Sequence, residues 1–165
     1  MELSIDVQGM ESLAENLQAT IVQVRAGTAA GVAKVAEAVR DAAQENVLSM
    51  GAVDTGELLD KIQTTPVEVS DDAIEARVES GAKHSIYVEM GTGPVGAASH
   101  DGINPEANPV YTDHGWTFPL PDGSGFRYTE GMPARPFMYP AKKLVEDQAK
   151  GIIAEEVRKA VQNGE

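Results

Sequence analysis

The chain has 165 residues, of which 42% are hydrophobic, and this composition suits one globular domain rather than a disordered segment. Its formal net charge of −13 excludes a protein that grips phosphate backbones or anionic membrane surfaces through clustered Lys and Arg. There is no cysteine, which excludes disulfides and thiolate chemistry, and no apolar run is long enough to span a bilayer.

The first 26 residues predict a strand and an amphipathic helix. Apolar and polar residues alternate over residues 3–7, which is typical of a short half-buried strand. A helix is then predicted over about residues 10–25, because apolar side chains recur on one face at helical spacing. That face carries Met10, Leu13, Leu17, Ile21 and Val24.

A second, longer helix is predicted from about Ala29 to Ser49. Gly27 and Thr28 interrupt the first helical pattern, and Thr28 is suited to cap the N-terminus of this second helix. The apolar stripe of the second helix consists of small residues, so a neighbouring element can approach it closely. Gly51 is expected to close the helix in the left-handed conformation.

A turn and a hairpin come next in the chain. Asp54 and Glu57 have the spacing of a capping box, which predicts a turn that enters one or two helical turns. Residues 63–70 and 73–81 then alternate between apolar and polar side chains, on either side of Asp71-Asp72. This pattern indicates an antiparallel hairpin with one face in water.

The second half of the chain contains most of its prolines and aromatics. A short helix is predicted from Lys83 to Met90, after which the periodicity disappears and a long loop is expected over residues 94–114. Residues 116–118 and 126–128 flank a turn signal and predict a second hairpin. Pro140 opens the last helix, because proline is tolerated in a first helical turn.

Together these elements predict an α+β fold. We expect an antiparallel sheet of hairpins packed against a long central helix and a C-terminal helix, with a long irregular loop. No linker divides the chain, so a single domain over residues 1–165 is expected.

Two motifs have enzymatic or ligand-binding interpretations. Asp54-Thr55-Gly56 is the triplet of aspartic proteases, in which two such aspartates share a proton, so a homodimer would have to supply the pair. A capped turn is the simpler interpretation. Gly91–Gly96 matches G-x-G-x-x-G, but a nucleotide site needs a strand before the motif and a helix after it, and we expect a flexible loop instead.

The remaining candidate groups are histidines and one arginine. His84, His100 and His114 have no zinc-binding spacing, so no metal or cofactor is predicted. Arg135 lies in a segment poor in basic residues, where it can form either a local ion pair or a contact with another subunit. No catalytic group is predicted.

Three segments, taken in order, resemble a bacteriophage family. They are Val53–Leu58, Tyr87–Gly93 and Ala134–Ala141, with a long helix before them and another after them. They resemble the gene-product-ten-like neck or tail-component proteins of long-tailed bacteriophages, typified by the lambdoid phage Hong Kong ninety-seven. The resemblance extends from about Ala29 to Val161.

The resemblance implies a small α+β structural protein of virion assembly, without enzymatic activity or cofactor. Such proteins act at the head–tail junction or at the tail end, as neck, head–tail connector or tail-completion proteins, and they work as rings. The implied partners are copies of the chain and other phage neck or tail proteins. The implied location is the virion, after synthesis in the host cytoplasm. Trp116 and Gly131-Met132 also resemble features of the family.

The residues themselves favour assembly as well. An aromatic-rich segment without catalytic groups is typical of a protein-binding surface. The acidic chain predicts no sequence-specific contact with nucleic acid, although DNA could pass through the assembly without sticking to it. A non-phage acidic binding module is the alternative. Interface side chains are predicted at Tyr87, Glu89, Trp116, Phe118, Arg135, Phe137 and Tyr139.

Overall fold

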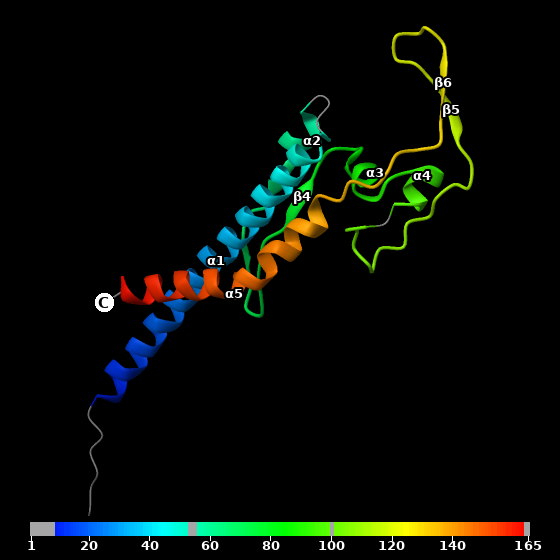
Figure 1. Ribbon diagram of the computed structural model, residues 1–165. Helices are drawn as coiled ribbons and strands as arrows, with labels where there is room; N and C mark the ends of the chain where they lie inside the picture. The colour runs from blue at the N-terminus through cyan, green and yellow to red at the C-terminus, as the bar shows by residue number, and fades with distance from the viewer. Residues whose placement is uncertain (1–8, 53–55, 100, 164–165) are drawn as a thin grey trace, which may run out of the picture.

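The computed structural model describes residues 9–52, 56–99 and 101–163. Two long helices cross each other, one hairpin runs alongside them, and short helices, loops and a second hairpin lie at one end of the pair (Figure 1). The helices are α1 (Met10–Ser49) and α5 (Met138–Gln162). The α+β fold is therefore confirmed, whereas the strand predicted over residues 3–7 lies outside the described residues.

Helix α1 is continuous, so the predicted break near Gly27 is wrong. The Thr28 hydroxyl donates a hydrogen bond to the Val24 carbonyl within the helix, and does not cap a new one. Gly27 and Gly31 lie where α5 crosses: a Cβ on Gly31 would stand 2.7 Å from the Ile153 Cα. The glycines therefore allow two helix backbones to approach closely, which offsets their low helix propensity.

The end of α1 agrees with the prediction. Gly51 has a φ of 59°, in the left-handed region, and directly follows the C-cap Met50. The amide of Ala52 donates to the Val47 carbonyl, and the amide of Gly51 donates to the Leu48 carbonyl. This pair of hydrogen bonds is the Schellman arrangement, which satisfies carbonyls that the helix leaves open.

Charged groups also join the two long helices. The Lys34 ammonium on α1 lies 2.8 Å from the Glu156 carboxylate on α5, and Lys159 lies 2.9 Å from the same carboxylate oxygen. Hydrogen bonds from Lys34 and Lys159 hold the pKa of Glu156 below its ordinary value of 4.5. Because the pKa is lowered in the folded state, the stabilisation is present above pH 4.5 and is lost as the pH falls through the folded pKa.

We therefore expect Glu156→Gln to reduce the loss of stability that acid causes below pH 4.5. The measurement is the urea midpoint of both proteins at a series of pH values. Glu146→Gln is the control, because Glu146 pairs with Lys143 of the same helix and its side chain is more exposed, 51% against 13%. An equal effect of the two substitutions would contradict the prediction.

The first predicted hairpin is confirmed, as two antiparallel ladders. A one-turn helix α2 (Glu57–Asp60) leads into β1 (Ile62–Thr64), which pairs with β4 (Val78–Ser80). Nearer the turn, β2 (Glu68–Val69) pairs with β3 (Ile74–Glu75). The N-cap of α2 is Gly56, two residues later than the predicted capping box, whose Asp54 lies outside the described residues.

The two ladders of this hairpin differ in register by one residue. Thr64 pairs with Val78, and Glu68 pairs with Glu75, so three residues on one strand oppose two on the other. The extra residue falls beside Pro66, which has no amide hydrogen to donate. The Thr65 hydroxyl accepts from the Arg77 amide there, which replaces a ladder hydrogen bond.

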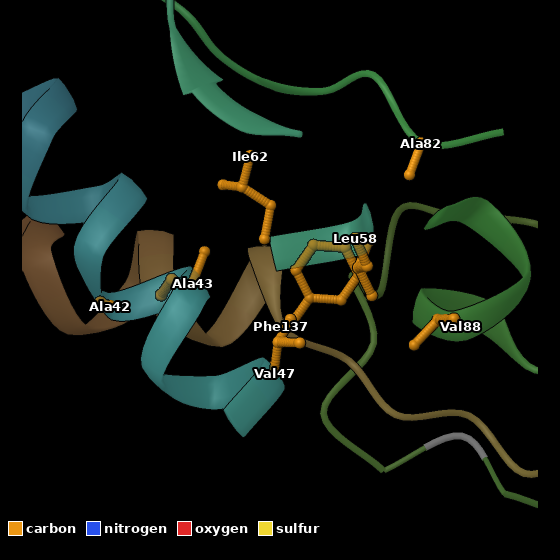
Figure 2. Close-up of a cluster of buried hydrophobic side chains, with 9 residues drawn as sticks. Ala42, Ala43, Val47, Leu58, Ile62, Ala82, Val88 and Phe137 are labelled. Atoms are coloured by element: carbon orange, nitrogen blue, oxygen red, sulfur yellow. The ribbon is translucent and has the colours of Figure 1, made fainter. Parts of the chain in front are cut away.

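The core lies where α1, the first hairpin and the start of α5 meet. Phe137, Ile62 and Val47 are its largest fully buried side chains, and Leu58 and Val88 close it from other elements (Figure 2). Two side-chain amides tie these elements together: Asn46 donates to the Phe137 carbonyl, and Gln44 donates to the carbonyls of Leu59 and Ile62. Most of the other core residues are alanines.

Beyond the core lie two short helices and a second hairpin. Helix α3 (Ser85–Met90) confirms the prediction for that segment. Helix α4 (Gly93–Ala97) stands where only a loop was expected. Strands β5 (Trp116–Pro119) and β6 (Phe126–Thr129) form the second predicted hairpin, which projects from the body as a separate ladder (Figure 1).

Candidate assembly surface

The segments around residues 87–93 and 132–141 pack directly against each other. The Arg135 amide donates to the Val88 carbonyl at 2.8 Å. Thr92 and Met132 form an antiparallel bridge, with each amide donating to the other's carbonyl at 2.9 Å and 3.2 Å. The chain between them, which contains α4 and the second hairpin, is therefore a long excursion closed at its base.

Glu89 holds the start of α5. Its carboxylate accepts hydrogen bonds from three successive amides, those of Phe137 at 2.7 Å, Met138 at 3.0 Å and Tyr139 at 3.1 Å. Such amides have no partner within their own helix, and the helix dipole favours a negative charge at this end. Glu89 is 8% exposed and is the buried charged residue of the described core. It thus fixes α3 to α5 with a strong, directional contact.

Glycines allow the base of the excursion to close. A Cβ on Gly91 would stand 2.6 Å from the Ala134 amide nitrogen, and one on Gly93 would stand 2.5 Å from the Glu130 carbonyl oxygen. Gly96 approaches Gly91 equally closely. The space beside the glycines of the G-x-G-x-x-G motif is thus filled by the chain's own backbone. Helix α4 begins within the motif and ends at Ala97, one residue after it, so the described residues that follow the motif do not form the helix that a nucleotide site needs. Helix α3, not a strand, precedes the motif.

An apolar groove lies beside this base. It has a volume of about 710 Å³, and α3, the loop before β5 and Trp116 line it. The Tyr111 hydroxyl donates to the Met90 carbonyl at 2.7 Å and so ties the loop to α3. Burial raises the pKa of the Tyr111 phenol. None of the residues that line the groove is charged.

The projecting hairpin presents aromatic side chains on both of its faces. Trp116 pairs with Thr129 and Phe118 pairs with Arg127, so these aromatics share one face. Phe126 and Tyr128 lie on the other face, where they are 76% and 61% exposed. Aromatic side chains exposed in this way are typical of surfaces that bind other proteins.

The structure separates the predicted interface residues into two groups. Glu89 and Phe137 are buried, at 8% and 2% exposure, so the prediction that they form a contact surface is corrected: they build the fold from within. Tyr87 and Trp116 are exposed at the groove. Phe118, Arg135 and Tyr139 are partly exposed, and for all five exposed or partly exposed residues an interface role stays a prediction.

Arg135 lines a second pocket, of about 450 Å³, together with His84 and residues of α2. Among the residues that the structure describes, its guanidinium forms no ion pair. The predicted local ion pair is therefore not seen in that part of the chain. The other alternative, a contact with another subunit, stays a prediction.

The enzymatic and metal-binding interpretations gain no support from the described residues. Asp54 and Thr55 of the protease triplet, and His100, lie outside them. His114 pairs with the neighbouring Asp113, and His84 is exposed. Over the described ranges, no three His, Cys, Asp or Glu side chains gather in a way that could hold a metal ion. The same ranges contain no helix that is both long and apolar enough to cross a membrane.

One surface was missed by the sequence reasoning. The apolar face over residues 10–24 of α1 was interpreted as the face of an amphipathic helix, but its side chains are 38–62% exposed. They are Met10, Leu13, Leu17, Ile21 and Val24. Periodicity reveals such a face and cannot say whether the same chain covers it.

Comparison with known protein families gives one result. Residues 10–91, about half of the chain, match the family model described as "Bacteriophage HK97-gp10, putative tail-component". No curated protein and no solved structure gives a match. The matched range begins earlier and ends earlier than the expected resemblance. It includes Val53–Leu58 and reaches Gly91, whereas Ala134–Ala141 lies outside it. Over residues 10–91 the chain therefore belongs to the HK97-gp10-like family of bacteriophage tail components.

Proposed function

We propose that the chain is a head–tail connector or tail-completion protein of a bacteriophage. In this role it acts without catalysis, at the head–tail junction or the tail end of the virion, by binding copies of itself and neighbouring tail proteins. The family match over residues 10–91 supports a tail component. That the chain joins the head to the tail, or completes the tail, is what we propose beyond the family match.

The observation that carries the proposal is the aromatic excursion clamped at its base. Glu89 and the Thr92–Met132 bridge hold both ends of the excursion on the core. The hairpin of the excursion projects from the body (Figure 1), and Phe126 and Tyr128 on it are exposed. A rigid base with an exposed aromatic tip is suited to insertion against a neighbouring subunit, because its side chains are positioned before contact.

The charge of the chain is consistent with a place beside packaged or passing DNA. A formal net charge of −13 repels phosphate, so a ring of such chains would let DNA pass without binding it. The passage of DNA is part of the proposal and requires that the copies form a ring.

Phe126→Ala tests the proposal. The side chain is 76% exposed at the tip of the hairpin, so its removal is expected to leave the free energy of unfolding within about 0.5 kcal/mol of wild type. In a complementation assay we expect the variant to lower the yield of tailed infectious particles by at least about tenfold, the effect of losing an aromatic hot spot. Electron microscopy would show heads and tails that are not joined.

Val69→Ala is the matched control, because Val69 is also exposed, at 53%, beside the turn of the other hairpin. It should leave the yield unchanged. A normal yield of joined particles from the Phe126 variant would count against the proposed function.

A further inference from the structure

Within residues 9–52, 56–99 and 101–163, two apolar surfaces are exposed, and they lie at opposite ends of the molecule. One is the helical stripe of α1, formed by Met10, Leu13, Leu17, Ile21 and Val24. The other is the groove between α3, the loop over residues 107–112 and Trp116. Figure 1 places the free end of α1 far from α3 and β5, so one chain cannot bring its own stripe to its own groove.

The stripe continues a face that is already used for helix packing. Gly31 follows Val24 by about two helical turns and so falls on the same face of α1, where Ile153 of α5 crosses it. Helix α5 leaves α1 near this crossing (Figure 1). The first turns of α1 therefore continue the face that α5 covers near Gly31, but α5 does not cover them.

Both surfaces are free of charge in a strongly acidic chain. The stripe contains no charged side chain, and the groove is lined by apolar, aromatic and uncharged polar residues. Two copies that each carry a formal charge of −13 repel each other over most of their surfaces. Close contact between copies is least opposed where both surfaces lack acidic groups, and the cores of protein interfaces are in general depleted in charged residues.

A helical stripe is the kind of surface that an apolar groove can accept. A helix presents aliphatic side chains as a ridge at i, i+3, i+7 and i+11, and an apolar groove accepts such a ridge in a recurring mode of recognition. The groove has a volume of about 710 Å³ and is walled by Tyr87, Tyr111 and Trp116, which is room for several aliphatic side chains.

We propose that the α1 stripe of one copy binds in the groove of the next copy. The contact is heterologous, because each chain offers its stripe to one neighbour and its groove to the other, and such contacts form a ring when the rotation between successive copies closes. The inference rests on the proposed function, since it names the surfaces through which the proposed oligomer forms. It assigns the partner of both surfaces to a second copy of this chain.

Cysteine cross-linking can test the pairing, because the chain has no cysteine of its own. Leu17→Cys marks the stripe and Val110→Cys marks the groove, where Val110 is 97% exposed. When the two single variants are mixed and treated with a short bismaleimide, we expect a covalent dimer that joins position 17 to position 110. A chain that carries both substitutions should give a ladder of oligomers, and neither single variant should cross-link to itself.

A second measurement uses a matched pair on α1. Leu17 and Leu48 are both 57% exposed, but Leu48 lies outside the stripe. We expect Leu17→Glu to raise the dissociation constant for self-association by at least about tenfold, since the contact would bury an unpaired charge. Leu48→Glu should change it less than about twofold. Analytical ultracentrifugation measures both.

Three results would overturn the inference: a chain that stays monomeric at every concentration, a Leu17→Cys variant that cross-links to itself as well as the mixture does, or equal effects of the two Glu substitutions. The role in joining heads and tails is tested separately, by the Phe126→Ala complementation assay. If the stripe bound another stripe while virions still assembled normally, the proposed function would stand and the proposed contact between stripe and groove would be wrong.

Discussion

Replacing Glu89 with alanine is expected to lower the free energy of unfolding by about 3–5 kcal/mol. The carboxylate is the acceptor for three amides at the start of α5, at 2.7–3.1 Å. Each buried N–H that loses its acceptor costs about 1–3 kcal/mol, and the favourable charge at the helix N-terminus is lost as well. Since domains are stable by only about 5–15 kcal/mol, much of the protein would unfold near its working temperature.

Urea denaturation, followed by far-ultraviolet circular dichroism, measures the change in the free energy of unfolding. Glu89→Gln should lose less, because its one carbonyl oxygen can still accept from some of the three amides. Glu79→Ala on β4 is the control, since that side chain is exposed. A Glu89→Ala protein within about 0.5 kcal/mol of wild type would show that water replaces the carboxylate at no cost.

Gly31→Ala is expected to destabilise the chain by about 1–3 kcal/mol, although alanine is the better helix former. The new methyl group would stand 2.7 Å from the Ile153 Cα and close to that residue's side chain. Backbone cannot rotate out of the way as a side chain can, so α1 and α5 would have to separate. Separation also weakens the contact between the Lys34 ammonium and the Glu156 carboxylate.

Gly151→Ala provides a control with the opposite sign. Gly151 is inside α5, and no atom beyond the helix lies within 4 Å of the position that its Cβ would take. This substitution should stabilise the chain by about 0.5–1 kcal/mol, the ordinary gain for alanine over glycine in a helix. Thermal unfolding of both variants measures the difference. If both substitutions stabilise the protein, the close helix crossing is not present in solution.

Local patterns predicted most of the elements of this fold. The first hairpin, α3, the second hairpin and α5 each arise from alternation or helical spacing within a short window. Their ends were also marked by residues with a local role, such as Gly51 after α1 and Pro140 in the first turn of α5. Local patterns could not predict the continuity of α1. Gly27 looks like a break in sequence, and only the arrival of α5 from more than 100 residues away explains it.

The candidate site was predicted by composition and resemblance, but the roles of its residues were not. Glu89, which lies in the segment Tyr87–Gly93, was expected at a contact surface. Its actual partners are amides 48 to 50 positions away, and no local spacing reveals such a contact. The same limit applies to Phe137, which is covered by side chains from α1, α2 and α3 (Figure 2). Burial is a property of the assembled chain, so sequence distance could not assign it.

The Thr92–Met132 bridge has a consequence for how this protein can change over time. The two attachment points of the excursion are neighbours, so the length of the segment between them can change without moving either attachment point. Doubling such an insert adds only about 0.6 kcal/mol of closure entropy. The family match ends at residue 91, at this seam. Evolution could therefore replace the whole segment between Thr92 and Met132 by another, and so change the binding partner, while the rest of the fold stays the same.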